Sequence, residues 1–154
     1  MVNQINGLKD IYKLLVNERK IGGAIEAESL RLRTGEVYKH AVITHVDLLG
    51  SAIYSLGFVT EDQENMIINI SELSLLQKPK FKRICEMNNQ AYKLVKTKEK
   101  LKYLKRLCDI NLGSSNVIFL EEAKLIIEDI GFAAVSSEID TNLIFPKDNV
   151  YSIA

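Results

Sequence analysis

EVYKHAVITHVDLLGSAIYSL, residues 36–56, is the stretch on which the fold class depends. Its apolar residues recur at steps of three and four, which is the spacing of one face of an α-helix. Thr34 precedes the stretch as a candidate N-cap, and Gly57 follows it as a helix stop. The spacing predicts a helix of about five turns. Its inward face would consist of Tyr38, Ala41, Val42, His45, Leu49, Ala52, Ile53 and Leu56.

Three further segments carry helix signals of the same kind. Each has a periodic apolar face, and each is bounded by a capping residue, a stop signal or both. The segments are 3–21, with Asn3 as N-cap and Gly22-Gly23 as stop; 61–77, opened by the capping box Thr60-Glu61-Asp62-Gln63; and 117–130, between Asn116 and Gly131.

The period of the pattern changes after Gly131. FAAVSSEI, NLIF and VYSI are typical of short strands, with Pro146 in a loop or at a sheet edge. The sequence therefore predicts a mainly α fold, with about five helices in a single bundle-like domain, 1–154. In this interpretation residues 3–131 are helical and residues 132–154 form a small C-terminal strand or hairpin element. Residues 24–33 fit either a strand or a short helix, and we leave them open.

Positive charge is concentrated in residues 78–106, KPKFKRICEMNNQAYKLVKTKEKLKYLKR. This segment holds 11 of the 20 Lys and Arg residues and 2 of the 20 Asp and Glu residues, although the whole chain has no net charge. Pro79 fits the first position of a helix, so the segment is predicted to be one long basic helix. At 100° per residue, four lysines cluster on the side roughly opposite the apolar stripe. They are Lys82, Lys93, Lys96 and Lys100.

A basic helix face of this kind predicts contact with nucleic-acid phosphate, either by the protein alone or as a subunit of a nucleoprotein complex. The candidate binding residues are Lys82, Arg83, Lys93, Lys96, Lys100 and Arg106. A second hypothesis is a self-associating adaptor or inhibitor whose basic face meets an acidic surface, because residues 107–154 carry 8 acids against Lys124 and Lys147. A third is a solvated face with no partner. A membrane partner is not expected, because the apolar stripe is narrow and lacks Trp.

The chain offers few residues for catalysis or metal binding. His40 and His45 are five residues apart and do not share a helix face, and His45 is expected to be a buried, hydrogen-bonded histidine. Arg33 and His40, separated by six residues, resemble the Arg-x(4–6)-His motif of HEPN-type helical ribonucleases. That resemblance implies a metal-independent RNA-cleaving enzyme. We otherwise expect no catalytic residue, metal or cofactor, and a non-enzymatic protein is the favoured interpretation.

Cys85 and Cys108 are predicted to lie on the same helix, about 35 Å apart at 1.5 Å per residue. That separation is too long for a disulfide, so two buried free thiols are expected. The apolar runs are far shorter than the ~20 residues that span a bilayer. The N-terminus lacks the basic and apolar segments of a secretory signal. These features predict a cytoplasmic protein.

Overall fold

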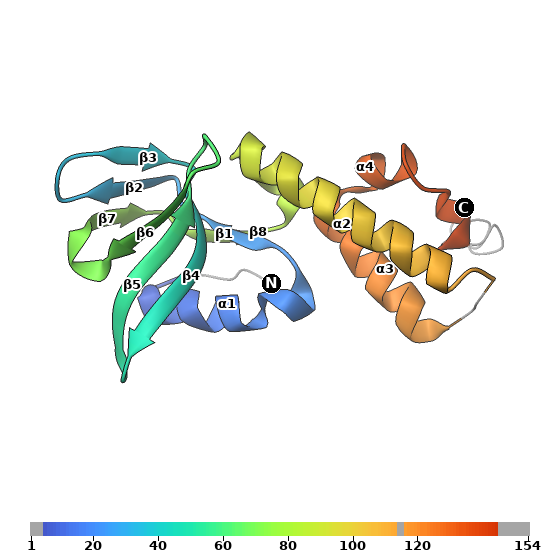
Figure 1. Cartoon of the computed structure of the whole chain (residues 1–154), viewed down its shortest axis with the longest axis horizontal. Helices are drawn as coiled ribbons and strands as arrows, with labels where there is room; N and C mark the ends of the chain where they lie inside the picture. Colours follow the sequence, from blue (N-terminus) through green and yellow to red (C-terminus); the bar gives the residue numbers. More distant parts are fainter. Residues whose placement is uncertain (1–4, 114–115, 145–154) are drawn as a thin grey trace. The chain divides into compact units, whose positions relative to one another are not determined.

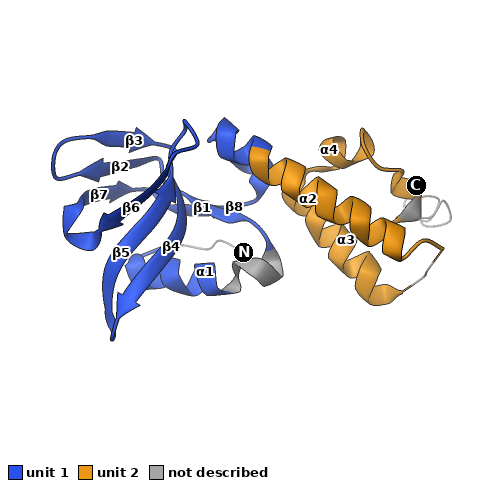
Figure 2. Cartoon of the chain, viewed as in Figure 1, with its two compact units in different colours: residues 1–94 blue, residues 95–154 orange. Residues whose placement is uncertain are grey.

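The structure is a computed structural model that describes residues 5–113 and 116–144. The chain divides into two compact units, residues 1–94 and residues 95–154 (Figure 2). The described residues form eight strands in two antiparallel sheets and four α-helices, and the strands all precede residue 83. The predicted helical bundle is therefore wrong. Whether the chain is one domain, as predicted, stays a prediction, and the two units are described separately.

The first unit contains helix α1 and all eight strands (Figure 1). A five-stranded sheet has the order β6-β5-β4-β1-β8, and a three-stranded sheet has the order β3-β2-β7. The elements are α1 (Leu8–Ile21), β1 (Ala24–Glu26), β2 (Ser29–Leu32), β3 (Val37–Lys39), β4 (Val42–Leu49), β5 (Ala52–Val59), β6 (Asn65–Asn69), the 3-10 turn η1 (Ile70–Glu72), β7 (Leu73–Gln77) and β8 (Lys80–Lys82).

Three stretches of chain pass from one sheet to the other at the same place. The crossing points are Ala27-Glu28 between β1 and β2, His40-Ala41 between β3 and β4, and Lys78-Pro79 between β7 and β8. The pairing register is the same on both sides: Glu26 pairs with Val42 and Lys80, and Ser29 pairs with Lys39 and Gln77. Backbone hydrogen bonds also cross this corner, from Ala27 to Ala41, from His40 to Glu28 and from Glu28 to Gln77. The two sheets are therefore joined by three neighbouring strands that bend together.

Residues 36–56 form β3, β4 and the first part of β5, and the helix predicted there is wrong. Leu49 pairs with Ala52, so Gly50 and Ser51 are a two-residue hairpin turn between β4 and β5. Gly50 has φ 66°, as a type II′ turn requires at its first central position. The strands are rich in β-branched and aromatic residues, which favour extended backbone. Along β4 the alternation of inward and outward side chains is interrupted by register shifts at Ile43/His45 and Asp47/Leu48. These irregularities give the apolar residues the mixed spacing that resembled a helical period.

The helix predicted for 61–77 is also wrong, because β6, η1 and β7 occupy it. Thr60 does use its hydroxyl as a cap, as its sequence context suggested. The hydroxyl accepts the N–H groups of Asp62 and Glu64, and Gln63 adopts φ 66°. This is a turn that returns the chain from β5 to β6 rather than the first turn of a helix.

A helix is present in the segment predicted as 3–21, and it ends before Gly22 as predicted, but it begins at Leu8 rather than near Asn3, which lies outside the described residues. Gly22 and Gly23 end the helix with φ 70° and 80°. Ile11 of α1 is fully buried among strand residues that include Ile25, Ile43 and Phe58. Apolar burial of this kind stabilises the unit by about 1.5–3 kcal/mol per large side chain. Residues 24–33, left open by the sequence, are the strands β1 and β2.

The second unit is helical in its described part (Figure 1). Helix α2 (Gln90–Ile110) begins in the first unit and continues into the second, and it is followed by α3 (Val117–Ile130), α4 (Phe132–Ser136) and the 3-10 turn η3 (Thr141–Leu143). The predicted limits of α3 are confirmed: the Asn116 side chain accepts the Ile118 N–H, and Gly131 ends the helix with φ 96°. The strand predicted at FAAVSSEI is wrong, because α4 begins there. The strand predicted at NLIF is also wrong, because the 3-10 turn η3 occupies its first residues, and Phe145 and VYSI lie outside the described residues.

The basic segment does not form one helix from Pro79. It is divided into β8, the 3-10 turn η2 (Ile84–Glu86) and α2. Cys85 therefore lies in η2 and Cys108 in α2, and both are free, as predicted. Cys108 is buried, and burial raises the pKa of its thiol, with a smaller contribution from the charge of Asp109. Cys85 is only partly buried. In the described part of the chain, no helix is both long enough and apolar enough to cross a membrane.

Gly23 provides a test of the pairing between β1 and β8. A Cβ at Gly23 would approach Phe81 Cζ to 2.6 Å and the Lys82 carbonyl oxygen to 2.8 Å, whereas a Cβ at Gly50 would meet nothing within 4 Å. Both glycines have positive φ. We expect Gly50→Ala to lower the free energy of unfolding by about 1–2 kcal/mol through backbone strain alone. Gly23→Ala should lower the free energy of unfolding by about 1–3 kcal/mol more than Gly50→Ala does, because its new methyl group also overpacks against Phe81 and the Lys82 carbonyl. Urea unfolding of both variants measures the difference, and equal losses would contradict the pairing.

Candidate functional site: a charged pocket at the sheet corner

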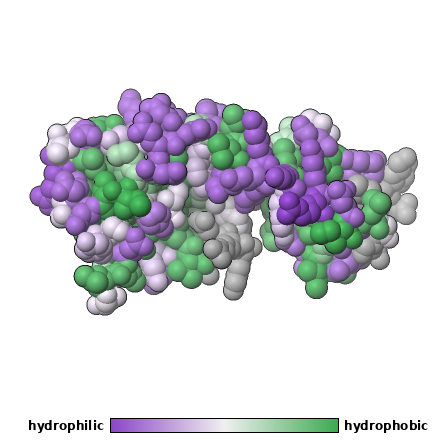
Figure 3. Space-filling model, viewed as in Figure 1, coloured by the Kyte–Doolittle hydropathy of each residue, from purple (hydrophilic) through white to green (hydrophobic). Residues whose placement is uncertain are grey.

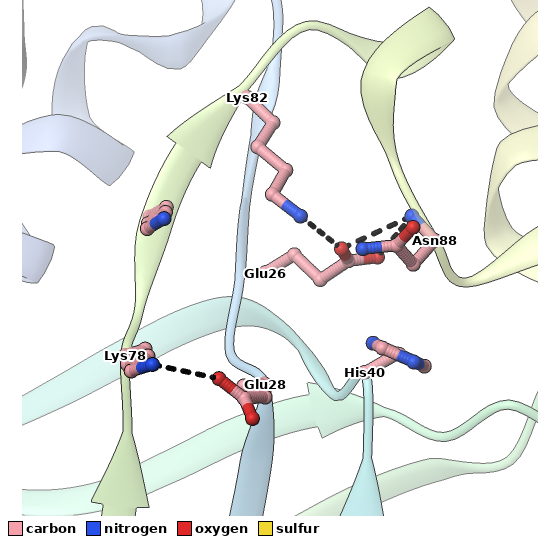
Figure 4. Close-up of a pocket in the computed structure, with 7 residues that line it drawn as sticks. Glu26, Glu28, His40, Lys78, Lys82 and Asn88 are labelled. Atoms are coloured by element: carbon pink, nitrogen blue, oxygen red, sulfur yellow. Dashed lines mark hydrogen bonds and ion pairs between the residues drawn. The ribbon is translucent and has the colours of Figure 1, made fainter.

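A pocket of about 320 Å³ opens at the corner where the three bent strands cross between the sheets. We call it the corner pocket, and Figure 4 shows how its side chains converge. It is lined by residues that are all polar or charged: Glu26, Glu28, His40, Lys78, Lys80, Lys82 and Asn88. They come from three separate crossing segments and from the turn before α2, so only the folded chain brings them together.

Lys80 and Lys82 reach the pocket because they alternate with Phe81 along β8. Side chains two residues apart lie on the same face of a strand. Lys80 is paired directly across from Glu26, so Lys82 shares the face of that carboxylate. Phe81 lies between them and packs on the hydrophobic core instead. Lys78 precedes β8 with φ 46° and lines the pocket from the crossing segment.

Glu26 is the buried centre of the pocket wall, with a side chain only 1% exposed. Its carboxylate accepts a hydrogen bond from Lys82 Nζ at 2.7 Å, and it accepts the backbone N–H groups of Asn88 at 3.0 Å and Asn89 at 2.7 Å. Figure 4 shows Lys82 and Asn88 approaching this carboxylate from different sides. We call Glu26, Lys82, Asn88 and Asn89 the Glu26 cluster. A buried carboxylate is tolerated here because a cation and two N–H groups replace its water.

Asn89 extends the Glu26 cluster to the start of helix α2. Its side-chain oxygen accepts the Tyr92 N–H at 3.0 Å, and its own carbonyl accepts the Lys93 N–H. It therefore caps the first turn of α2. Its amide nitrogen donates to the carbonyl oxygens of His40 at 2.9 Å and Thr60 at 3.2 Å. The beginning of α2 is consequently bound to two loops of the β unit as well as to β1.

The remaining cations of the pocket are more weakly held. Lys78 Nζ lies 3.7 Å from Glu28 Oε2, and both side chains are more than half exposed, so this pair contributes little stability. Lys80 makes no ion pair with any residue that the structure describes. The His40 imidazole has no hydrogen-bond partner among the described residues. Three ammonium groups thus face two carboxylates, and the pocket has an excess of hydrogen-bond donors.

Two lining residues have an unusual backbone conformation. His40 has φ 53° and Lys78 has φ 46°, and Gln63 is the other such non-glycine residue in the described chain. This left-handed region costs residues with a Cβ about 1–2 kcal/mol. Both residues lie at crossing points of the corner, so the bend between the sheets imposes the conformation. It also directs the His40 imidazole toward the pocket, as Figure 4 shows.

The structure scatters the six residues that the sequence predicted for nucleic-acid binding. Lys82 lies in β8 and binds Glu26, and Arg83 follows it before η2. Lys93, Lys96, Lys100 and Arg106 lie on α2. Lys96 pairs with Glu99 at 3.2 Å, and Lys100 pairs with the buried Asp129. The lysines expected to form one external face are therefore divided between a strand and a helix, and most are bound to carboxylates.

The predicted orientation of the basic face on α2 is also wrong. Leu104 and Cys108 are the buried residues of α2. At 100° per residue, Lys100 lies only about 40° from Leu104 around the helix, and Lys93 about 20° from it. The prediction failed because it included Ile84 and Met87 in the apolar stripe of a helix that in fact begins at Gln90. Lys93, Lys96 and Lys100 are accordingly only partly exposed.

Arg33 and His40, the residues that resemble the ribonuclease motif, are not brought together. They lie at opposite ends of the hairpin formed by β2 and β3. Arg33 is in the turn, where the Leu32 N–H donates to the Glu36 carbonyl. His40 is at the open end, where its N–H donates to the Glu28 carbonyl. His45, expected to be a buried helical histidine, lies on β4 with its side chain 45% exposed and its ring against Gly57. Within the described chain, no three metal-binding side chains gather at one place.

Comparison with known proteins gives no match: no family model, curated protein or solved structure is similar to this chain. The function must therefore be argued from the geometry of the chain itself.

Sequence reasoning missed the corner pocket, although a signal for its lysines was present. Lys78, Lys80 and Lys82 alternate with Pro79 and Phe81, which is the period of a strand with one charged face. Glu26, Glu28 and His40 carried no such signal. They reach the pocket through pairing between segments that lie 12 to 54 positions apart in the sequence, which no local pattern records.

The Glu26 cluster predicts unequal effects for two similar glutamates. We expect Glu26→Gln to lower the free energy of unfolding by about 3–5 kcal/mol, because it leaves one partner of a buried ion pair without its counter-charge. Glu28→Gln removes an exposed carboxylate from the same pocket and should cost less than about 1 kcal/mol. Urea unfolding of the two variants checks this. A loss for Glu26→Gln no greater than that for Glu28→Gln would show that the cluster does not stabilise the unit.

Proposed function

We propose that this protein is a non-enzymatic binding protein whose corner pocket takes a small anion of the phosphate type. The observation that carries the proposal is the convergence of three lysines and one histidine on one pocket, with the Lys80 ammonium and the His40 imidazole unpaired among the described residues. Such groups donate charge-assisted hydrogen bonds to oxyanions.

The size and chemistry of the pocket support a small polar ligand. A volume of about 320 Å³ is at the lower end of the range for small-molecule sites. Those sites are mostly apolar, whereas this one is lined by charged and amide side chains, so charge rather than apolar burial must supply the affinity. The Glu26 carboxylate is already satisfied by three donors, which reduces its repulsion of an anion.

The position of β8 gives its lysines a second effect. β8 is an edge strand, and lysines and proline on an edge hinder pairing with another chain. That effect accounts for Lys78, Pro79 and Lys80 as surface residues. It does not account for His40 and Asn88, which reach the same pocket from other segments. Binding rather than catalysis is proposed because the lining residues include no hydroxyl or thiol nucleophile.

We place this binding protein in the cytoplasm. The support is chemical: neither Cys85 nor Cys108 forms a disulfide in the described chain, which is the usual state of cysteines in a reducing compartment. We do not retain the ribonuclease hypothesis, because Arg33 and His40 lie at opposite ends of a hairpin and share no site.

Calorimetric titration with inorganic phosphate and pyrophosphate at low salt tests the pocket. We expect saturable binding to the wild-type protein. Lys80→Gln should weaken binding by about tenfold or more, since a hydrogen bond to a charged group contributes about 1.5–3 kcal/mol. Lys9→Gln removes one exposed lysine from α1, outside both the corner pocket and helix α2, and is the matched control that should leave the affinity unchanged.

Two results would overturn the proposal. One is the absence of binding to the wild-type protein at millimolar anion. The other is equal weakening by Lys80→Gln and Lys9→Gln, which would indicate a general charge effect. Circular dichroism of each variant confirms that the fold is retained, and it is expected to be, because Lys80 is exposed.

A further inference from the structure

Helix α2 carries a row of exposed cations that is separate from the corner pocket. Lys98, Lys102 and Arg106 follow one another at four-residue steps, and all three are exposed. At 100° per residue they lie about 120–160° from the buried Leu104, on the side of the helix turned to solvent. We call these three residues the α2 cation row. Hydrophilic side chains cover much of the visible surface of α2 in Figure 3.

The cation row differs from three other lysines of α2 in its partners. Lys96 pairs with Glu99, Lys100 with Asp129, and Lys105 with Glu138 at 2.8 Å. The hydrogen bond from Lys105 lowers the pKa of the Glu138 carboxyl. By contrast, the three residues of the cation row make no ion pair with the described part of the chain. Lys93 has no ion pair there either, but it is only partly exposed, so the cation row is the exposed series of cations on α2 without carboxylate partners.

This arrangement carries an electrostatic cost within the helix. Lys98 and Lys102, and Lys102 and Arg106, are like-charge pairs at i and i+4, each unfavourable by a few tenths of a kcal/mol. Asp109 lies on the same side one turn beyond Arg106 and marks the end of the row. A ligand with regularly spaced negative charges would remove the repulsion.

We propose that the α2 cation row binds the phosphate backbone of a nucleic acid. Eight residues of helix place Lys98 and Arg106 about 12 Å apart along the axis. That length corresponds to about three or four nucleotides at 3.4 Å per step on one strand. Arg106 has the planar donor geometry that suits phosphate, and the lysines act as point charges. Contacts to phosphate alone make the binding independent of base sequence.

The row replaces the residues that the sequence predicted for this role. Of those six, Arg106 alone belongs to it, because the others are divided between β8, its following turn and the inner side of α2. The proposed ligand, nucleic-acid phosphate, is the same one that the basic segment 78–106 suggested. The surface consists of the cations of α2 that are both exposed and without a carboxylate partner among the described residues.

Fluorescence anisotropy with short single-stranded and double-stranded oligonucleotides, measured as a function of salt, tests the row. Three phosphate contacts predict a slope of log K against log salt of about −2 to −3. Between about 50 and 200 mM salt the affinity should therefore fall about 20- to 40-fold. The triple variant Lys98→Gln/Lys102→Gln/Arg106→Gln should lose nearly all of this slope. Gln has a helix propensity close to that of Lys and Arg, so α2 is retained.

The double variant Lys9→Gln/Lys39→Gln is the matched control. It removes two exposed lysines of α1 and β3, which lie outside both the cation row and the corner pocket, and should leave the slope unchanged. The calorimetric titration with inorganic phosphate reports on the corner pocket separately, so failure of the row and failure of the pocket give different results. The proposal is wrong if the triple variant binds oligonucleotide like wild type, or if wild type does not bind at about 50 mM salt. Binding of polyglutamate as tightly as oligonucleotide would assign the row to an acidic protein partner instead.

Discussion

The described fold of the β unit depends on one buried carboxylate. Glu26 has no water to satisfy it, and it receives the Lys82 ammonium together with the N–H groups of Asn88 and Asn89. These three donors come from the edge strand β8 and from the turn that begins α2. A carboxylate at this position therefore fixes where the edge strand ends and where the long helix starts, because an unpaired buried charge costs several kcal/mol.

The corner beside Glu26 explains why the charged residues gather there. Three neighbouring strands bend at one place without a change of register, and a bend of that kind interrupts side-chain packing on its outer side. The polar residues of the crossing segments line the resulting space, and two of them, His40 and Lys78, have positive φ. The same geometry that joins the sheets thus forms a pocket with surplus donors. The candidate site is a consequence of the topology.

The sequence predicted the elements whose signals are local. Helices α1 and α3 each have an apolar helical period and a glycine stop, α3 also has the cap Asn116, and both helices were recognised. Residues 36–77 were misread because bulges in β4 and short strands separated by turns imitate a helical period, although the Gly50-Ser51 pair between β-branched runs indicated a hairpin. The site was less predictable. Glu26 meets Lys82 and Asn88 only through pairings more than fifty residues apart, whereas the alternating lysines of β8 were visible in the sequence.

Amide hydrogen exchange at single-residue resolution tests the Glu26 cluster most directly. Asn88 and Asn89 precede α2 and belong to no strand, so their N–H groups have no backbone partner in a helix or sheet ladder. If Glu26 holds them, they exchange as slowly as the strand N–H groups of the core around Ile25 and Ile43. Exchange at the rate of an open loop would mean that the carboxylate does not bind them, and the account of both the pocket and the start of α2 would be contradicted.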